Sequence, residues 1–552
     1  MKKRTIGATS ILATLLATIA IGCEGTDDAK TITPHAGDTR SSLLSRRAVL
    51  AAHAPGATRL DAVDAPHASG IAHTDLALPD VGPPIPLKYR AFAAAFDAER
   101  QSLGAPGAAV AILEHGELTF ARGFGTKGPN STAAVDARTL FRIGSMTKSL
   151  TAAAFLRLED EGKVSTQERL TDFEPSVALS GPDVPKLRMK DLLSQQSGLF
   201  DYSNFGTDPA VTSESCPTDP GALQSFITGT EFGKDEFFAA PPGALFGYSN
   251  PNYVLTGAAI ERVSGVPYVD AMERLFRPLG MNRTFFLASQ VVADGDFADG
   301  LSTNPDGSPW DVAPGSYDCA WLRPAGYAFS SVEDYAKFMR FLYAGDPRVL
   351  SDRNRLAMQT AQVDTFLYGD TYSYGYGLFV QSGIGQPSGY YHTKTVTHGG
   401  SISGFSSNFY LLPETGFGIV TFANADNAYF YSSVELAFQS FGSLPAPTAP
   451  PASAKVEPGA FPQYAGSYFD PSGQLGEIDI VDQNGALTIA MPQLDAAQVP
   501  YSPALQPISN RNFDLTLAGQ DLNLKFVPGS TGRYEWVEID GLIATRMEPD
   551  GG

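Results

Sequence analysis

The chain has 552 residues, with 59 acidic and 39 basic side chains and a formal net charge of −20 at pH 7. This length allows more than one domain and a large core. The acidic excess argues against nucleic acid as a partner, because few cations remain to neutralise phosphates. The histidines and cysteines form no zinc-type cluster, and we expect neither a metal nor another cofactor.

The first 23 residues are typical of an export signal. Basic residues at positions 2–4 precede an apolar run, 11–21, that is too short to span a membrane permanently. The run ends in Ala-Ile-Gly-Cys, and its Cys23 resembles the lipid-bearing cysteine of bacterial lipoproteins. The alternative is an ordinary secretory signal with an incidental cysteine. Either way we expect an exported protein of the bacterial periplasm or cell surface, anchored in a membrane if Cys23 carries lipid.

A low-complexity tether is predicted for residues 24–85, which are rich in Ala, Asp, Thr and Pro and lack sustained periodicity. The body of the protein is predicted to follow at residues 86–444. It opens with two expected strands, 108–113 and 118–121, which are joined by a tight turn.

Two late strands, 407–412 and 416–422, are predicted near the end of the body. Helical patterns lie between the early and the late strands. This order predicts an α+β body whose sheet combines both ends of the domain.

The tetrapeptide Ser145-Met146-Thr147-Lys148 opens an apolar helical run that we expect to extend to about Glu161. Residues three apart share a helix face, so the lysine amine can reach the serine oxygen. A serine needs a base to become a nucleophile, and a desolvated lysine can serve as one. Alone, this pattern also fits a helix-capping serine followed by a surface lysine.

A second motif, Tyr248-Ser249-Asn250, follows about 100 residues later. It precedes a helix that is expected to begin at Pro251 and to end before Gly265, since proline fits the first turn of a helix. A tyrosine beside a cationic lysine can have a lowered pKa and relay protons. The asparagine amide can hold a substrate carbonyl.

A third motif, His398-Gly399-Gly400-Ser401, lies on a late strand. Its glycines let a substrate backbone approach closely, and the N–H group that follows them can point into a site. His398 by itself also fits a structural histidine on a strand.

A proline-rich linker is predicted at residues 445–459, and a small all-β, barrel-like domain at 460–549. Short alternating runs separated by Gly, Asn and Pro support this assignment. All three motifs precede the linker. We therefore expect removal of residues from about 446 onward to leave the chemistry at Ser145 intact, unless this domain packs on the body.

In this order and spacing, the three motifs resemble those of the penicillin-recognising serine hydrolases, which include class C β-lactamases, D-alanyl-D-alanine carboxypeptidases and related esterases. The tyrosine of the second motif and the histidine of the third resemble the carboxypeptidase branch typified by the Streptomyces DD-peptidase. Supporting stretches are Asp191–Leu199, Pro242-Gly243, Pro324–Gly326 and Tyr374–Leu378. The resemblance covers roughly residues 87–440 and implies a β-lactamase-like fold, with a mainly antiparallel sheet and a helical subdomain.

The resemblance also implies a mechanism. Ser145 would attack a carbonyl of a small-molecule or peptidoglycan-peptide substrate, and Lys148 and Tyr248 together would take its proton. Backbone N–H groups of Ser145 and Ser401 would stabilise the oxyanion. The residues expected to bind substrate are Asn250, His398, Gly399 and Gly400, with His398 supporting Tyr248 or contacting the leaving group.

One departure from the family bears on substrate. The carboxypeptidase relatives carry arginines just after the Tyr-Gly-x-Gly-Leu strand, where this chain has the uncharged Phe379, Val380 and Gln381. A substrate carboxylate would be poorly held there without a cation. Lys394, on the same strand face as His398, is a candidate substitute. A D-alanyl-D-alanine carboxypeptidase, a β-lactamase-related amide or ester hydrolase, an esterase without peptidase specificity, and a silent peptidoglycan-binding relative all remain open.

The two cysteines of the body, Cys216 and Cys319, are predicted to pair. Export brings the chain to a compartment where disulfides can form, and a lipidated Cys23 would leave no other mature cysteine.

Overall fold

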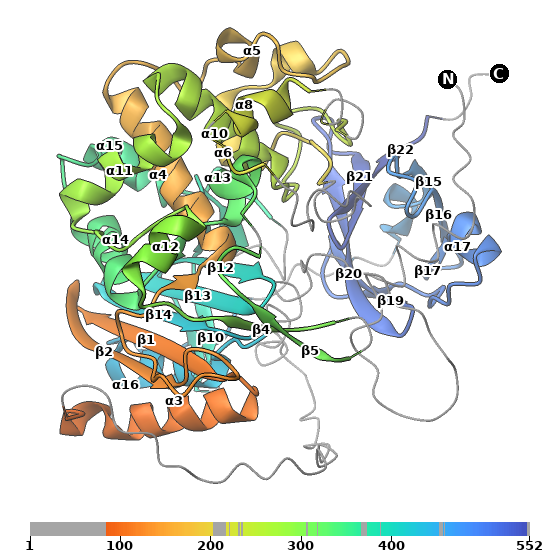
Figure 1. Cartoon of the computed structure of the whole chain (residues 1–552). Coiled ribbons are helices and arrows are strands. Elements are labelled where there is room, and N and C mark those ends of the chain that lie inside the picture. The colour runs from red at the N-terminus through yellow and green to blue at the C-terminus, as the bar shows by residue number, and fades with distance from the viewer. Residues whose placement is uncertain are drawn as a thin grey trace.

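The computed structural model describes residues 84–201, 217–219, 221–229, 232, 236–304, 307–316, 318–365, 372–386, 388–451, 456 and 459–548. The predicted export signal with Cys23, the tether as far as residue 83, and Cys216 lie outside these residues. Figure 1 shows an α+β body beside a smaller β domain, as the sequence predicts. Within the described part of the chain, no helix is long and apolar enough to cross a membrane.

The centre of the body is an antiparallel sheet of eight strands. In order across the sheet, the strands are β2 (Glu117–Gly125), β1 (Gly107–Glu114), β14 (Phe417–Ala423), β13 (Phe405–Leu412), β12 (Thr395–Ile402), β9 (Phe379–Gln381), β8 (Tyr372–Tyr374) and β7 (Val363–Asp364). The early hairpin pairs with the last strand of the body through β1 and β14. This confirms that one sheet combines both ends of the domain.

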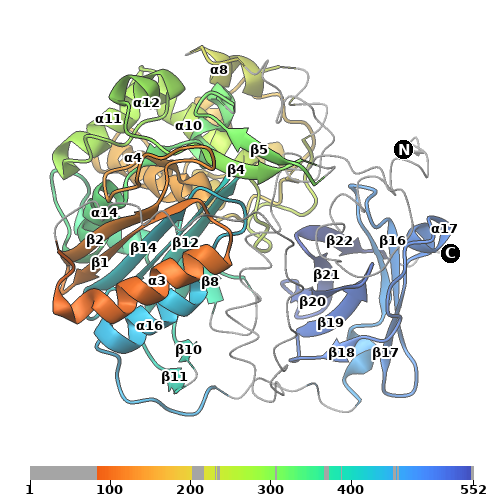
Figure 2. The same cartoon turned by 60° about the horizontal axis from the view of Figure 1, so that its bottom comes forward.

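Helices cover both faces of this sheet (Figure 2). On one face lie α3 (Arg90–Ser102) and α16 (Tyr431–Phe441), which share an apolar core with alternate residues of β1 such as Val110 and Ile112. The intervening residues of β1 point to the other face. There they join a second, larger core with α4 (Thr147–Asp160) and α14 (Val332–Ala344).

Further helices and short strand pairs complete the body. The helices are α5 (Leu170–Phe173), α6 (Met189–Leu193), α8 (Ala222–Ile227), α10 (Pro251–Ser264), α11 (Tyr268–Leu279), α12 (Ala288–Asp294), α13 (Arg323–Gly326) and α15 (Asp352–Met358). The strand pairs are β3 (Phe141–Arg142) with β6 (Phe329–Ser330), β4 (Gly300–Thr303) with β5 (Pro309–Val312), and β10 (Ile384–Gln386) with β11 (Gly389–Tyr391). Helix α10 confirms the prediction from Pro251, and Gly265 ends it at a φ of 70°.

The C-terminal domain is a second antiparallel sheet of eight strands. They are β17 (Leu487–Ala490), β16 (Glu477–Asp482), β15 (Gly466–Phe469), β22 (Leu542–Arg546), β21 (Tyr534–Ile539), β20 (Gln520–Pro528), β19 (Asn512–Leu517) and β18 (Gln506–Pro507), with α17 (Pro492–Ala496) following β17. The sheet curves until the Leu505 N–H donates to the Leu487 carbonyl at 3.0 Å and the Ile489 N–H to Pro503 at 2.8 Å. The domain is therefore the nearly closed barrel that the alternating sequence predicts.

Candidate active site

Ser145 lies in a 3₁₀ turn, η2 (Gly144–Met146), at the head of the buried helix α4. Gly144 has a φ of 49°, and a Cβ there would lie 2.6 Å from the Ser401 nitrogen on β12. A Cβ on Gly400 would lie 2.0 Å from the Ile143 carbonyl oxygen. The turn and the strand can approach this closely only because both positions are glycine. That approach brings Ser145 beside the Ser401 backbone, as the oxyanion prediction requires.

Lys148 occupies the first turn of α4 and is completely buried. Its amine donates hydrogen bonds to Ser145 Oγ at 3.1 Å, to Asn250 Oδ1 at 2.6 Å and to the Ala325 carbonyl at 2.7 Å. Burial lowers the pKa of this lysine to about 7, although the negative charge of Asp201 partly opposes the shift. The structure thus excludes the interpretation of Lys148 as a surface lysine.

Tyr248 and Asn250 close the site from the segment that leads into α10. The Lys148 amine lies 4.9 Å from the centroid of the Tyr248 ring, so the cation of the protonated lysine faces the aromatic system. Asn250 is the residue before Pro251, and its amide bridges two charged groups. Its Oδ1 accepts from Lys148, and its Nδ2 lies 3.4 Å from Asp201 Oδ2.

Asp201 is a buried carboxylate that the sequence-based prediction missed. It follows the Asp191–Leu199 stretch, which was noted only as support for the family resemblance. That stretch also holds Gln195, whose φ is 60°. The Gln195 side-chain oxygen accepts from the Ser249 N–H at 2.9 Å, which fixes the backbone between Tyr248 and Asn250. Asp201 itself belongs to no motif that could have marked it as a site residue.

His398 lies on β12 and is almost completely buried. Its Nε2 shares a hydrogen bond of 3.1 Å with the Tyr374 hydroxyl, and its Nδ1 lies 2.6 Å from the Gly399 carbonyl oxygen. The rings of His398 and Tyr248 are 6.3 Å apart between centroids. The histidine is therefore next to Tyr248, and Tyr374 is the partner that the sequence did not predict.

Beyond Thr397, the described part of the chain pairs β12 on one side only, with β13. Strand β9 pairs with β12 only at Thr395, Val396 and Thr397. No described strand continues that pairing along 398–401, where Gly399 and Gly400 lie. An extended substrate could add itself to this edge next to Ser145.

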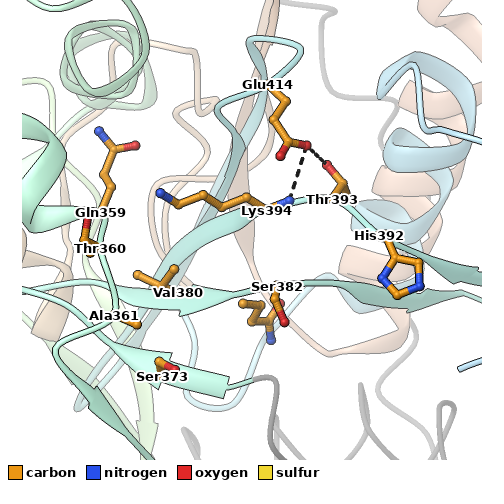
Figure 3. A pocket seen from close by; sticks show the side chains of 11 residues that line it. Gln359, Thr360, Ala361, Ser373, Val380, Ser382, His392, Thr393, Lys394 and Glu414 are labelled. Atoms are coloured by element: carbon orange, nitrogen blue, oxygen red, sulfur yellow. Dashed lines mark hydrogen bonds between the residues drawn. The ribbon is translucent and has the colours of Figure 1, made fainter. Parts of the chain in front are cut away.

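Lys394 lies just before β12 and lines a cavity of about 510 Å³. Figure 3 shows its side chain extending across this pocket toward Gln359 and Thr360. The pocket also contains Val380 and Gln381, two of the three uncharged positions where the carboxypeptidase relatives carry arginines, but none of the three motifs lines it. Burial lowers the pKa of Lys394, and the charge of Glu414 opposes that shift.

Phe379, the third uncharged position, is buried, with its ring centroid 5.4 Å from that of His398. Cys319 takes part in a disulfide, as its predicted pairing requires. Its proposed partner, Cys216, lies outside the described residues.

A comparison with family models matches residues 92–436 to the beta-lactamase family. The chain belongs to this family. Its members are hydrolases, in general serine hydrolases, and the family match covers the body with all three motifs.

Curated relatives resemble the chain at modest identity. The unguisins hydrolase ungD' of Aspergillus campestris is 28% identical over 348 residues, which are 60% of this chain and 61% of the relative. Protein flp of Staphylococcus aureus is 25% identical over 334 residues, which are 60% of this chain and 62% of the relative. The chain spans about three fifths of the length of these relatives.

Solved structures share the fold. SurE has a TM-score of 0.60 at 22% identity, and the octameric penicillin-binding protein homologue from Pyrococcus abyssi has 0.55 at 22%. Each of these two comparisons covers 83% of this chain and 99% of the other chain. The 83% is more than the share of this chain that the body alone makes up. The D-amino acid amidase from Ochrobactrum anthropi SV3 has a TM-score of 0.53 at 24% identity, covering 64% and 99%.

Proposed function

We propose that the chain is a serine hydrolase that forms an acyl-enzyme on Ser145 and releases the acyl group to water. The observation that carries this proposal is the contact of 3.1 Å between the Lys148 amine and Ser145 Oγ. Burial lowers the pKa of that amine to about 7. A general base works best when its pKa lies near the working pH, because the free base is then both populated and basic.

In the first half of the reaction, Ser145 Oγ attacks the substrate carbonyl carbon and its proton passes to neutral Lys148. The carbonyl oxygen becomes an oxyanion that the N–H groups of Ser145 and Ser401 stabilise. When the tetrahedral intermediate collapses, Tyr248 delivers the proton to the leaving group and is reprotonated from Lys148. In the second half, water attacks the acyl-serine, and the same groups return a proton to Ser145 Oγ.

Small amides and esters are the substrate class that we infer, with D-amino-acid amides and D-alanyl-D-alanine peptides as the first candidates. Structural neighbours described as a D-amino acid amidase and a D-stereospecific amidohydrolase support this choice. The edge of β12 along residues 399–401, which no described strand pairs on the β9 side, supports an extended acyl chain. Asn250 would orient that chain, although Lys148 and Asp201 already engage its amide.

An esterase without peptidase specificity is the second candidate. The observation in its favour is the lack of charge at Phe379, Val380 and Gln381, of which Phe379 is buried against His398. Activated esters have leaving groups that need little acid assistance. They also have no terminal carboxylate that the enzyme must bind. A silent relative that only binds peptidoglycan is the third possibility.

The test is to incubate the purified protein with a labelled penicillin, a fluorophosphonate, a p-nitrophenyl ester, and the D and L forms of an amino-acid amide. We expect covalent labelling of Ser145 by the fluorophosphonate, turnover of the ester, and faster hydrolysis of the D amide than of the L amide. The Ser145→Ala variant is the control. Ester turnover without amide turnover would select the esterase, and failure of every probe to acylate Ser145 would select the silent relative.

We also propose that the mature protein is exported and anchored through a lipid on Cys23. The apolar run that ends at this cysteine supports the proposal. Cys23→Ser should move the protein from the membrane fraction to a soluble fraction. Equal amounts of the wild type and of Cys23→Ser in the membrane fraction would contradict the lipid anchor.

A further inference from the structure

The outward face of the C-terminal barrel is buried where β20, β21 and β22 turn toward the body. Leu524 and Val537 point into the barrel core, whereas Val527, Trp536 and Ile543 point outward and are still at most 7% exposed. The outward residues form one apolar cluster with body residues, here called the contact cluster. Its buried members are Ala239, Ala240, Leu245, Val527, Trp536 and Ile543.

Both cartoon views agree with this arrangement. Strands β20 to β22 lie on the side of the barrel that faces the body, whereas β16 and β17 lie on the far side (Figures 1 and 2). The barrel therefore packs on the body through a defined face instead of being joined to it only by the linker.

The body side of the contact cluster belongs to the segment that leads directly into Tyr248. Thr545 on β22 donates from its hydroxyl to the Ala239 carbonyl at 3.2 Å. At the other end of the segment, a Cβ on Gly247 would lie 3.1 Å from the Cδ1 atom of Ile543. Gly247 is the residue before Tyr248, so the barrel contacts the chain one residue from the proposed proton relay.

The same segment is bonded on its other side to the stretch that holds Gln195 and Asp201. The Gly247 N–H donates to the Gln195 carbonyl at 2.8 Å, and the Gly243 N–H donates to the Gln196 carbonyl at 2.7 Å. Gln195 in turn accepts from the Ser249 N–H. Residues 237–247 are thus held between the barrel and the 195–201 stretch, with little freedom to move unless one of these two neighbours moves.

We propose that the barrel positions Tyr248, with Ile543 as the positioning residue. This proposal rests on the proposed function, since Tyr248 is the proton relay of that mechanism. A relay displaced by even 1 Å transfers protons poorly, and such displacements by distant changes can cost about a hundredfold in rate. We therefore expect that removal of residues from 446 onward impairs acylation of Ser145. The order of the motifs along the sequence had predicted that this truncation leaves acylation intact.

The first test compares the full-length Ile543→Asp and Val481→Asp variants. Both place a carboxylate on the outside of the barrel, but Val481 lies on β16 and is 47% exposed. We expect Ile543→Asp to lower kcat for a D-amino-acid amide, whose leaving group needs the proton from Tyr248, by about tenfold or more with little change in KM. Val481→Asp should stay within about twofold of the wild type. Equal kcat values in the two folded variants would overturn the proposal.

The second test introduces a steric contact between Gly247 and Ile543. Gly247→Ala should slow acylation by about threefold to tenfold, because its new methyl group meets Ile543 Cδ1. Ile543→Val deletes that Cδ1 atom, so the double variant should recover most of the lost rate. An equal penalty for Gly247→Ala in both backgrounds would contradict a role for Ile543.

Hydrogen exchange separates this proposal from the proposed function, because it needs no activity. The amides of Gly243 and Gly247 should exchange faster in Ile543→Asp than in the wild type, and as in the wild type in Val481→Asp. Unchanged exchange at both amides in Ile543→Asp would overturn the positioning role, whether or not Ser145 is acylated. Faster exchange in a protein that no probe acylates would leave the positioning contact standing and reject the proposed function.

Discussion

Lys148 and Lys394 are two lysines near β12 whose surroundings differ sharply. Burial lowers the pKa of both amines. The Lys148 amine is fully enclosed and donates to three oxygens, one of them Ser145 Oγ, whereas Lys394 is half-buried and extends into a pocket. Its amine forms no hydrogen bond or ion pair with the described residues. A lowered pKa therefore does not by itself identify a catalytic lysine. The contact with Ser145 Oγ is what distinguishes Lys148, the proposed base, from Lys394.

The largest expected effect is at the nucleophile. Ser145→Ala should abolish covalent labelling and lower kcat by at least ~10³-fold, because nucleophile and base act as one unit. Intact-mass analysis after fluorophosphonate treatment measures the labelling. Retained label on another residue of the variant would remove Ser145 from its proposed role.

The next effect separates the two lysines. Lys148→Ala and Tyr248→Phe should each be nearly as damaging as Ser145→Ala, and the double variant little worse than either, because both serve one proton-transfer path. Lys394→Ala, the matched control, should leave ester hydrolysis within about twofold. Steady-state kinetics on the four variants check this. Two losses that simply multiply would show that Lys148 and Tyr248 act independently.

A smaller effect concerns the carboxylate of peptide substrates. A charge-assisted contact typically contributes ~1.5–3 kcal/mol, so its absence should cost about tenfold to a hundredfold in kcat/KM. We expect a D-alanyl-D-alanine peptide and its C-terminal amide to be hydrolysed with similar kcat/KM. A strong preference for the free acid that Lys394→Ala abolishes would make the pocket of Figure 3 the carboxylate site. A strong preference that survives Lys394→Ala would mean that another group binds the carboxylate. It would contradict the interpretation that residues 379–381 leave the site without a carboxylate-binding cation.

The smallest effect is a shift of pH dependence. The charge of Asp201 raises the pKa of Lys148 against the larger lowering by burial. Asp201→Asn keeps an oxygen that can accept from Asn250 but removes the charge, so the pKa of Lys148 should fall further. The acidic limb of the acylation rate should then move to lower pH. A limb that stays in place or moves to higher pH would exclude this electrostatic role for Asp201.

The sequence predicted most of the fold because its signals are local. Continuous apolar runs in β1 and β14, proline and glycine at the two ends of α10, and short alternating runs after the linker each specify an element from its own residues. The resemblance to a known family then supplied the arrangement of the three motifs, and the structure brings Ser145, Lys148 and Asn250 into direct contact.

What the sequence did not predict depends on contacts between distant segments. Asp201 carries no motif of its own, and its burial beside Asn250 follows only from folding. Tyr374 was noted as part of a family stretch, but its bond to His398 requires β8, β9 and β12 to lie side by side. The packing of Ile543 on the segment before Tyr248 joins residues almost 300 positions apart, which no periodicity encodes.

The most direct test of the account is the pH dependence of Ser145 acylation by a fluorophosphonate, whose leaving group needs no protonation in this range. If neutral Lys148 is the base, protonation removes it, so the rate should rise with pH through a midpoint near the lysine pKa of about 7 and then level off. The same profile should persist in Lys394→Ala and disappear in Lys148→Ala. A wild-type rate that is flat across neutral pH, or that keeps rising toward the ordinary lysine pKa, would contradict the central claim that Lys148 activates Ser145.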